Sequence, residues 1–169
     1  MPRLHCTRPA RVVIATLLLV GTTFAADKTN TIGPNRAKWQ KVRTRAVNFL
    51  KSAQDDDGSW TSPQAAGLTA LATTALLDSG LKADDPVVAR SLAYLESLAQ
   101  KNGGIYHPKT LHRNYETSIA MLAMTAASSS ATPAARKRYA AHIAGALKFL
   151  MNLQWDKGEV LVTSDPGFL

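Results

Sequence analysis

Few side chains in this chain of 169 residues have the type and spacing for chemistry. Glu116 is the strongest catalytic candidate, because a carboxyl group near the start of an apolar helix can act as a general acid. The competing interpretation, which we favour, is a carboxylate that only balances the positive end of the helix dipole. Tyr115, Thr117 and Thr73 are polar side chains on otherwise apolar helices, and we expect them to line a cavity.

Histidine and acidic residues do not predict a metal site. His107 and His112 lie five residues apart in one loop, a spacing that allows a metal pair but is more common for surface or hydrogen-bonded histidines. Asp55-Asp56-Asp57 falls in a turn, where acidic side chains are normally solvated. Asp84 and Asp85 precede a predicted helix, which is typical of a cap. We therefore expect no metal and no cofactor.

The N-terminal residues predict a signal peptide over residues 1–25. Arginines precede the apolar run Val12–Val20, and small residues precede a cleavage point after Ala25. The run is shorter than the roughly 20 apolar residues of a spanning helix, so we expect export, no membrane span after cleavage and a flexible lead-in over residues 26–36. The only cysteine, Cys6, precedes the apolar run, so the mature chain has neither disulfide nor thiolate ligand.

The charge of the chain is moderately basic. Of the formal net charge of +8, three charges belong to leader arginines, which leaves +5 for the mature chain. No basic recognition helix or aromatic-rich basic sheet accompanies this excess, and Arg136-Lys137-Arg138 is typical of a solvated helix face. We therefore expect no nucleic-acid partner.

A short motif recurs three times along the chain. Each copy has an aromatic-Leu pair at a helix end, then a Gln, then a Gly, and the first copy adds a Trp. The copies are Phe49-Leu50 with Gln54, Gly58 and Trp60, Tyr94-Leu95 with Gln100 and Gly103, and Phe149-Leu150 with Gln154 and Gly158. The glutamines follow one another after 46 and then 54 residues, which predicts a repeat architecture.

The residue types of this motif suit a joint between structural units. A Gln at a helix end can bond the free backbone groups there. A Gly after an acidic turn permits a positive φ, and a Trp can bury its ring while its N–H finds an acceptor. We therefore interpret the motif as structural.

The hydrophobic pattern predicts an all-α fold with two kinds of helix. Amphipathic and fully apolar segments alternate, and the fully apolar ones read as buried on all sides. The predicted helices are 37–54, 67–77, 86–99, 115–127 with Asn114 as its cap, and 133–153. Packing the apolar helices behind the amphipathic ones gives a double-layered array of helical hairpins. Only residues 159–162 have a pattern that would also allow a β-strand.

The motif resembles the QW repeat of the squalene–hopene cyclase and prenyltransferase superfamily. The resemblance covers the chain from about Trp39 to Gly158 and is nearest to exported proteins with squalene-cyclase C-terminal-type repeats. It implies helical hairpins of the α/α-toroid type (terpenoid cyclase/protein prenyltransferase-like) over 37–169, and an apolar isoprenoid ligand. A closed ring of that superfamily has many more hairpins, so the resemblance also implies an incomplete ring and a truncated member.

The chemistry of that superfamily has no counterpart in this sequence. The protonating Asp-x-Asp-Asp motif would fall at Lys82-Ala83-Asp84-Asp85, where the first acid is missing, and the zinc site of the prenyltransferases needs a cysteine. We therefore expect a non-catalytic member. The alternative is a non-enzymatic repeat module that binds a protein or peptide partner, and an α/α-barrel polysaccharide enzyme ranks last. We also expect the open array to self-associate.

Overall fold

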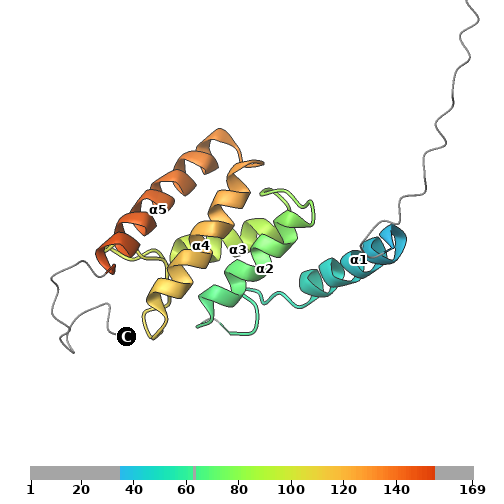
Figure 1. Cartoon of the computed structure of the whole chain (residues 1–169), viewed down its shortest axis with the longest axis horizontal. Coiled ribbons are helices and arrows are strands. Elements are labelled where there is room, and N and C mark those ends of the chain that lie inside the picture. The colour runs from blue at the N-terminus through green and yellow to red at the C-terminus, as the bar shows by residue number, and fades with distance from the viewer. Residues whose placement is uncertain (1–34, 63, 155–169) are drawn as a thin grey trace, which may run out of the picture. The chain divides into compact units, whose positions relative to one another are not determined.

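The computed structural model describes residues 35–62 and 64–154, which all lie in one unit, Pro34–Leu169. This part of the chain contains five α-helices and no strand (Figure 1). The helices are α1 (Arg36–Ser52), α2 (Ala66–Asp78), α3 (Pro86–Ser97), α4 (Arg113–Ser128) and α5 (Pro133–Asn152). The all-α prediction is confirmed for these residues. The predicted signal peptide, Gly158 and the possible strand lie outside them.

Side-chain caps set the starts of three helices. Asn35 Oδ1 accepts from the N–H groups of Ala37 and Lys38 at the start of α1. Asp85 caps α3 by accepting from Val87 N at 3.1 Å, and Thr132 caps α5. Each of these residues satisfies backbone donors that have no partner inside the helix.

The start of α4 differs from the prediction. Glu116 N donates to His112 O at 2.9 Å, so the first intrahelical hydrogen bond begins at His112 and the helix at Arg113. Asn114 therefore lies inside the first turn and is not the cap; its Oδ1 accepts from the next N–H, that of Tyr115.

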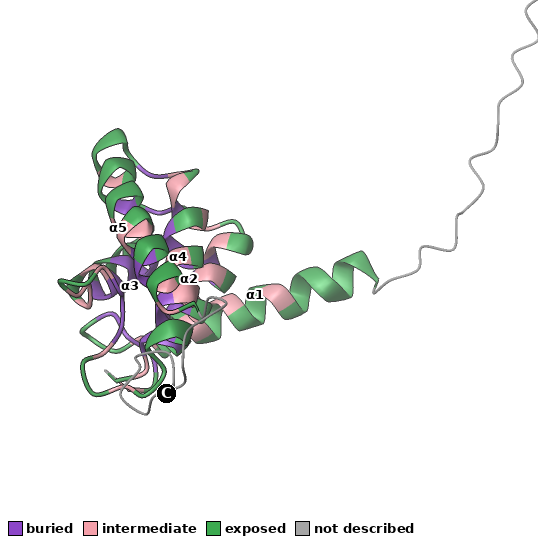
Figure 2. Ribbon diagram, turned by 60° about the vertical axis from the view of Figure 1, so that its left-hand side comes forward, coloured by how far each residue is buried: buried purple, intermediate pink, exposed green. Residues whose placement is uncertain are grey.

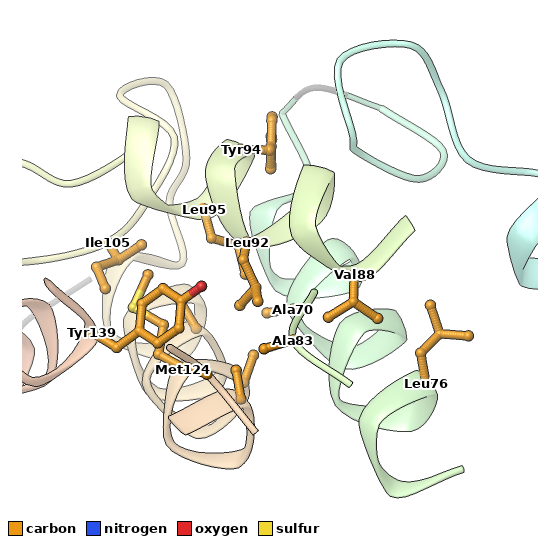
Figure 3. Packing of buried hydrophobic residues seen from close by; sticks show 14 of the residues in the cluster. Ala70, Leu76, Ala83, Val88, Leu92, Tyr94, Leu95, Ile105, Met124 and Tyr139 are labelled. Carbon is orange, nitrogen blue, oxygen red and sulfur yellow. The ribbon is translucent and has the colours of Figure 1, made fainter. Parts of the chain in front are cut away.

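Helices α2 and α4 lie side by side and run in the same direction (Figure 1). Near their starts, Gly67 lies against the ring of Tyr115. Just past their ends, Ala83 N donates to Ser130 Oγ at 2.9 Å. Helix α3 packs on α2 and α5 packs on α4, so the helices form two layers. The core between them holds Leu92, Leu95, Ile105, Met124 and Tyr139 (Figure 3).

Helices α2 and α4 are not buried on all sides, so that prediction is wrong. Leu68 and Leu71 on α2 are 49% and 43% exposed, and Leu122 on α4 is 54% exposed. One face of each of these two helices packs against the neighbouring helices. The opposite face of each is not covered by any described residue. An apolar helix without a polar face then presents leucines to solvent.

The packing face of α1 also differs from the prediction. The helical spacing of Trp39, Val42, Ala46, Phe49 and Leu50 predicts one packed apolar stripe. Of these residues only Leu50 packs against the core, together with Val47 near the C-terminal end of α1, and the other four are exposed (Figure 2). Contacts at that end orient the helix, because Trp60 Nε1 donates to Leu50 O and Lys51 Nζ pairs with Asp85 at 2.9 Å. None of the described helices combines the length and hydrophobicity needed to cross a bilayer.

Candidate functional site

The first turn, residues 54–60, is fastened to α3 by Gln54. Its Nε2 donates to Gly58 O at 3.1 Å within the turn and to Val87 O at 2.9 Å in α3. Its Oε1 accepts from Nε and Nη2 of Arg90 at 3.0 and 2.7 Å. The amide therefore joins the turn after α1 to the start of α3. We call α1, α3 and α5 the outer helices and α2 and α4 the inner helices. Arg90 was not singled out from the sequence, although it lies four residues before Tyr94 of the second aromatic-Leu pair.

Two glycines of the motif lie in close backbone contact with the next outer helix. Gly58 has φ +89°, and a Cβ there would lie 2.5 Å from Arg90 O. Gly103 has φ +93°, and a Cβ there would lie 2.5 Å from Gly145 O. Both positions therefore need glycine for its backbone conformation and for space. Arg90 and Gly145 each lie four residues before the aromatic residue of their helix, so the two joints are equivalent.

Trp60 closes the first turn. Its side chain is only 4% exposed, and besides the bond from Nε1 to Leu50 O, its backbone N donates to Thr69 Oγ1 at 3.2 Å. Trp60 therefore links the end of α1, through its indole N–H, to α2, through its backbone N–H. The indole N–H satisfies one of the carbonyl groups that the helix end leaves free.

The second turn, residues 100–106, repeats the first with a shift of register. In the second turn Gln100 N donates to Gly104 O, and in the first turn Asp55 N donates to Ser59 O. Gln100 therefore occupies the position in its turn that Asp55 occupies in the first. The two glutamines of the motif are therefore not structurally equivalent. Gln100 Nε2 bonds Leu98 O and Tyr106 O within its own turn and does not reach the next helix.

The aromatic residues of the motif have different surroundings. Phe149 is buried beneath the second turn, with its ring 5.5 Å from that of Tyr106, and Tyr94 is also buried. Phe49 is 68% exposed. Gln154 follows α5 and donates its backbone N–H to Met151 O.

Glu116 is a buried carboxylate that holds a loop. It is 5% exposed, Oε2 accepts from His107 N at 2.9 Å, and Oε1 accepts from Thr110 Oγ1 at 2.8 Å. Both oxygens are thus engaged with residues of the loop that precedes α4. This geometry supports a role for the carboxylate in positioning the loop.

Two carboxylates flank Tyr94. Burial raises the pKa of Tyr94 to about 12, and the negative charges of Asp57 and Glu116 add to the effect. Hydrogen bonds from Ser59 hold the pKa of Asp57 below its usual value, so this carboxylate stays charged. The raised pKa therefore keeps the Tyr94 phenol neutral at physiological pH, and the lowered pKa keeps Asp57 ionised.

The structure does not bring the expected cavity-lining residues together. Thr117 is fully buried and accepts from Ile105 N at 3.1 Å, and Thr73 is fully buried with Oγ1 2.8 Å from Ser91 Oγ. Both threonines join α2 or α4 to the turn or helix behind it. Tyr115 is 48% exposed and lies on the opposite face.

A hollow at the helix ends and the histidine-containing loop are two further candidate places for a site. An open hollow of about 450 Å³ lies between the ends of α2 and α4, bordered by Asp78, Lys82 and Thr125. Within residues 35–62 and 64–154, no three histidine, cysteine or acidic residues gather as metal ligands would. His107 Nδ1 accepts from Lys109 N instead.

Comparison of the chain with family models, with curated proteins and with solved structures finds no match. Residues 35–62 and 64–154 form an all-α fold in which glycine- and glutamine-containing turns join the helices.

We expect Glu116→Gln to loosen the loop over residues 107–112. An amide keeps one acceptor oxygen but replaces the other with a donor, so either His107 N or the Thr110 hydroxyl loses its partner, at a cost of about 1–2 kcal/mol. Hydrogen exchange should show faster exchange of the His107 amide. Asp84→Asn, which neutralises an exposed acid, is the control, and equal exchange in both variants would contradict the loop-holding role.

The raised pKa of Tyr94 predicts a loss of stability at high pH. Because the folded pKa of about 12 exceeds the ordinary value of 10.0, the stabilisation is complete below pH 10 and is lost as pH rises towards 12. Two pKa units correspond to at most about 3 kcal/mol. Urea unfolding of the wild type and of Tyr94→Phe measures the effect, since the variant should lose less stability over this range. Parallel curves for the two proteins would refute it.

Proposed function

We propose that this chain is an exported, non-catalytic helical-repeat module of the QW type, with hairpins arranged as in an α/α toroid, and that it binds an apolar segment of a protein or peptide partner. The observation that carries the proposal is the exposed apolar surface on the two inner helices. We call this surface, made of Leu68, Leu71, Tyr115 and Leu122, the inner face. Its four side chains are 43% to 54% exposed.

The inner face has the character of a binding surface. Soluble proteins rarely leave a continuous apolar patch uncovered unless something binds there. The patch lies on two parallel helices that are fixed to each other by the contact of Gly67 with Tyr115, so it is rigid enough to recognise a shape. Curved arrays of helical hairpins commonly bind peptides and proteins in this manner.

The state of Glu116 supports a function without catalysis. It is the acid nearest to this surface in sequence, directly after Tyr115, and both of its oxygens are bonded to the loop. No described side chain of the inner face is an acid or a base. Binding is therefore the chemistry that these residues supply.

An isoprenoid chain is the second candidate ligand. The apolar inner face favours it, as does the resemblance of the turns to the QW repeat. The openness of the face argues for the protein partner, because small-ligand sites normally enclose most of the ligand surface.

Peptide selection on the full chain tests the proposal. Phage-displayed random peptides selected on the wild type should lose binding to the double variant Leu71→Ser/Leu122→Ser. They should keep binding to Leu147→Ser/Met151→Ser, which removes two equally exposed apolar side chains from α5. If the selected peptides bound both double variants as well as they bind the wild type, the inner face would be rejected as the binding surface. A thermal shift with squalene or a polyprenol that only the first variant loses would favour the second candidate.

A further inference from the structure

Helix α1 combines an uncovered apolar face with a purely basic charge. Trp39, Val42, Ala46 and Phe49 follow one another at helical spacing and are all exposed. The helix carries six basic residues and no acidic one: Arg36, Lys38, Lys41, Arg43, Arg45 and Lys51. By the helical period, Lys38 and Arg45 border the apolar face beside Phe49.

Exposure of this face is particular to α1. Phe49, Tyr94 and Phe149 hold the same place in the aromatic-Leu pairs of the three outer helices. Tyr94 and Phe149 are 9% and 7% exposed, while Phe49 is 68% exposed. In α3 and α5, a preceding turn covers this region of the helix, as the contacts of Gly58 and Gly103 show. Among residues 35–62 and 64–154, no turn lies on the corresponding surface of α1, so none of them covers it.

A second copy of the chain is a poor partner for this face. Helix α5, the outer helix at the other end of the described residues, carries four basic residues and no acidic one. Pairing α1 with α1, or α1 with α5, would bring together charges of the same sign, which destabilises association. Charge complementarity requires an anionic partner.

We propose that α1 binds an anionic lipid surface. A helix with Trp and Phe on one face and Lys and Arg bordering it lies in the plane of a membrane interface with its apolar face among the headgroups. Each basic residue near an anionic leaflet contributes favourably. Helix α1 projects from the other described helices and contacts them mainly through Val47 and Leu50 (Figure 2). A flat surface can therefore reach its apolar face without meeting the rest of the fold. This inference does not rest on the proposed function of the inner face.

The acidic turn after α1 sets the orientation of binding. Asp55, Asp56 and Asp57 are exposed just beyond the C-terminal end of the helix, and they would be repelled by the same leaflet. Lys51 is already paired with Asp85. The N-terminal part of α1, with Trp39 and Val42, therefore enters the interface more deeply than Phe49 does.

Flotation of the full chain with vesicles tests the proposal. The wild type should bind vesicles of phosphatidylcholine mixed with phosphatidylglycerol and bind pure phosphatidylcholine weakly, and added salt should reduce the binding. Trp39→Ser/Phe49→Ser and, separately, Lys38→Glu/Arg45→Glu should each lower the bound fraction at least about tenfold. All proteins compared carry the same apolar run Val12–Val20, so any binding by that run is common to them.

Matched controls separate the role of α1 from general charge and hydrophobicity. Lys137→Glu/Lys148→Glu makes the same charge change on exposed positions of α5, and Leu147→Ser/Met151→Ser removes two exposed apolar side chains from the same helix. Both controls should bind as the wild type does. Equal binding by all variants, or no preference for phosphatidylglycerol, overturns the proposal. So does an oligomer that forms without lipid and dissociates in Trp39→Ser/Phe49→Ser, because a second copy would then cover the face.

Discussion

Gly58→Ala is expected to destabilise the protein by about 3 kcal/mol or more, and Gly103→Ala by a similar amount. An alanine at positive φ costs about 1–2 kcal/mol by itself, and the new methyl group would lie 2.5 Å from a backbone carbonyl oxygen of the next helix in each case. The helix must move away to relieve this contact, which typically costs a further 1–3 kcal/mol or so. Equilibrium unfolding in urea measures the difference.

Gly80 provides the control for this prediction. Its φ of +96° is as unfavourable for alanine as that of the two turn glycines, yet nothing lies within 4 Å of a Cβ there. Gly80→Ala should therefore show only the backbone cost of about 1–2 kcal/mol. If Gly58→Ala and Gly80→Ala were equally destabilising, the close approach of the turn to Arg90 would have no energetic importance.

Trp60→Ala is expected to cost about 3–5 kcal/mol, the range for removing a large buried aromatic side chain. The substitution leaves a cavity between the first turn and the helices, and it removes the bond from Nε1 to Leu50 O. Thermal and urea unfolding, monitored by far-ultraviolet circular dichroism, should show a lower midpoint.

Trp39→Ala is the matched variant, because this second tryptophan is 52% exposed and its removal should change stability by no more than about 0.5 kcal/mol. A small effect of Trp60→Ala would mean that the turn does not depend on its ring. A large effect of Trp39→Ala would mean that α1 has a contact in solution that its exposed side chain does not reveal.

The helices could be predicted from the sequence because their signals are local. Asp85 before Pro86 marks the start of α3, and Pro133 marks that of α5. The start of α4 was placed late because the polar side chain of Asn114 suggested a cap, while the bond from Glu116 N to His112 O extends the helix backwards. That bond depends on the conformation of the loop, which local propensity does not specify.

The structural roles of individual residues could be predicted only in part from the sequence. The need for glycine at 58 and 103 followed from the turn, but the approach of each to a particular carbonyl did not, because it depends on how helices pack. Thr73 and Thr117 are buried between the layers, since an inner helix can turn a hydroxyl towards its neighbours as easily as towards a cavity. For Glu116, no sequence pattern identified the two loop donors.

The exposed face of α1 was missed for a related reason. Periodicity showed that Trp39, Val42 and Phe49 share one side of the helix, but it could not show whether anything covers that side. In α3 and α5 the cover comes from the turns that contain Gly58 and Gly103, whereas no described residue covers the same side of α1.

The turn glycines contact carbonyl oxygens, and every amino acid has a carbonyl oxygen. Arginine occupies the receiving position in one joint and glycine in the other, and both accept the incoming turn at the same separation. The identity of the side chain at the receiving position is therefore of little importance for this contact. A substitution that keeps the helix should be tolerated at residue 90 far better than one at Gly58 or Gly103, as far as this contact is concerned.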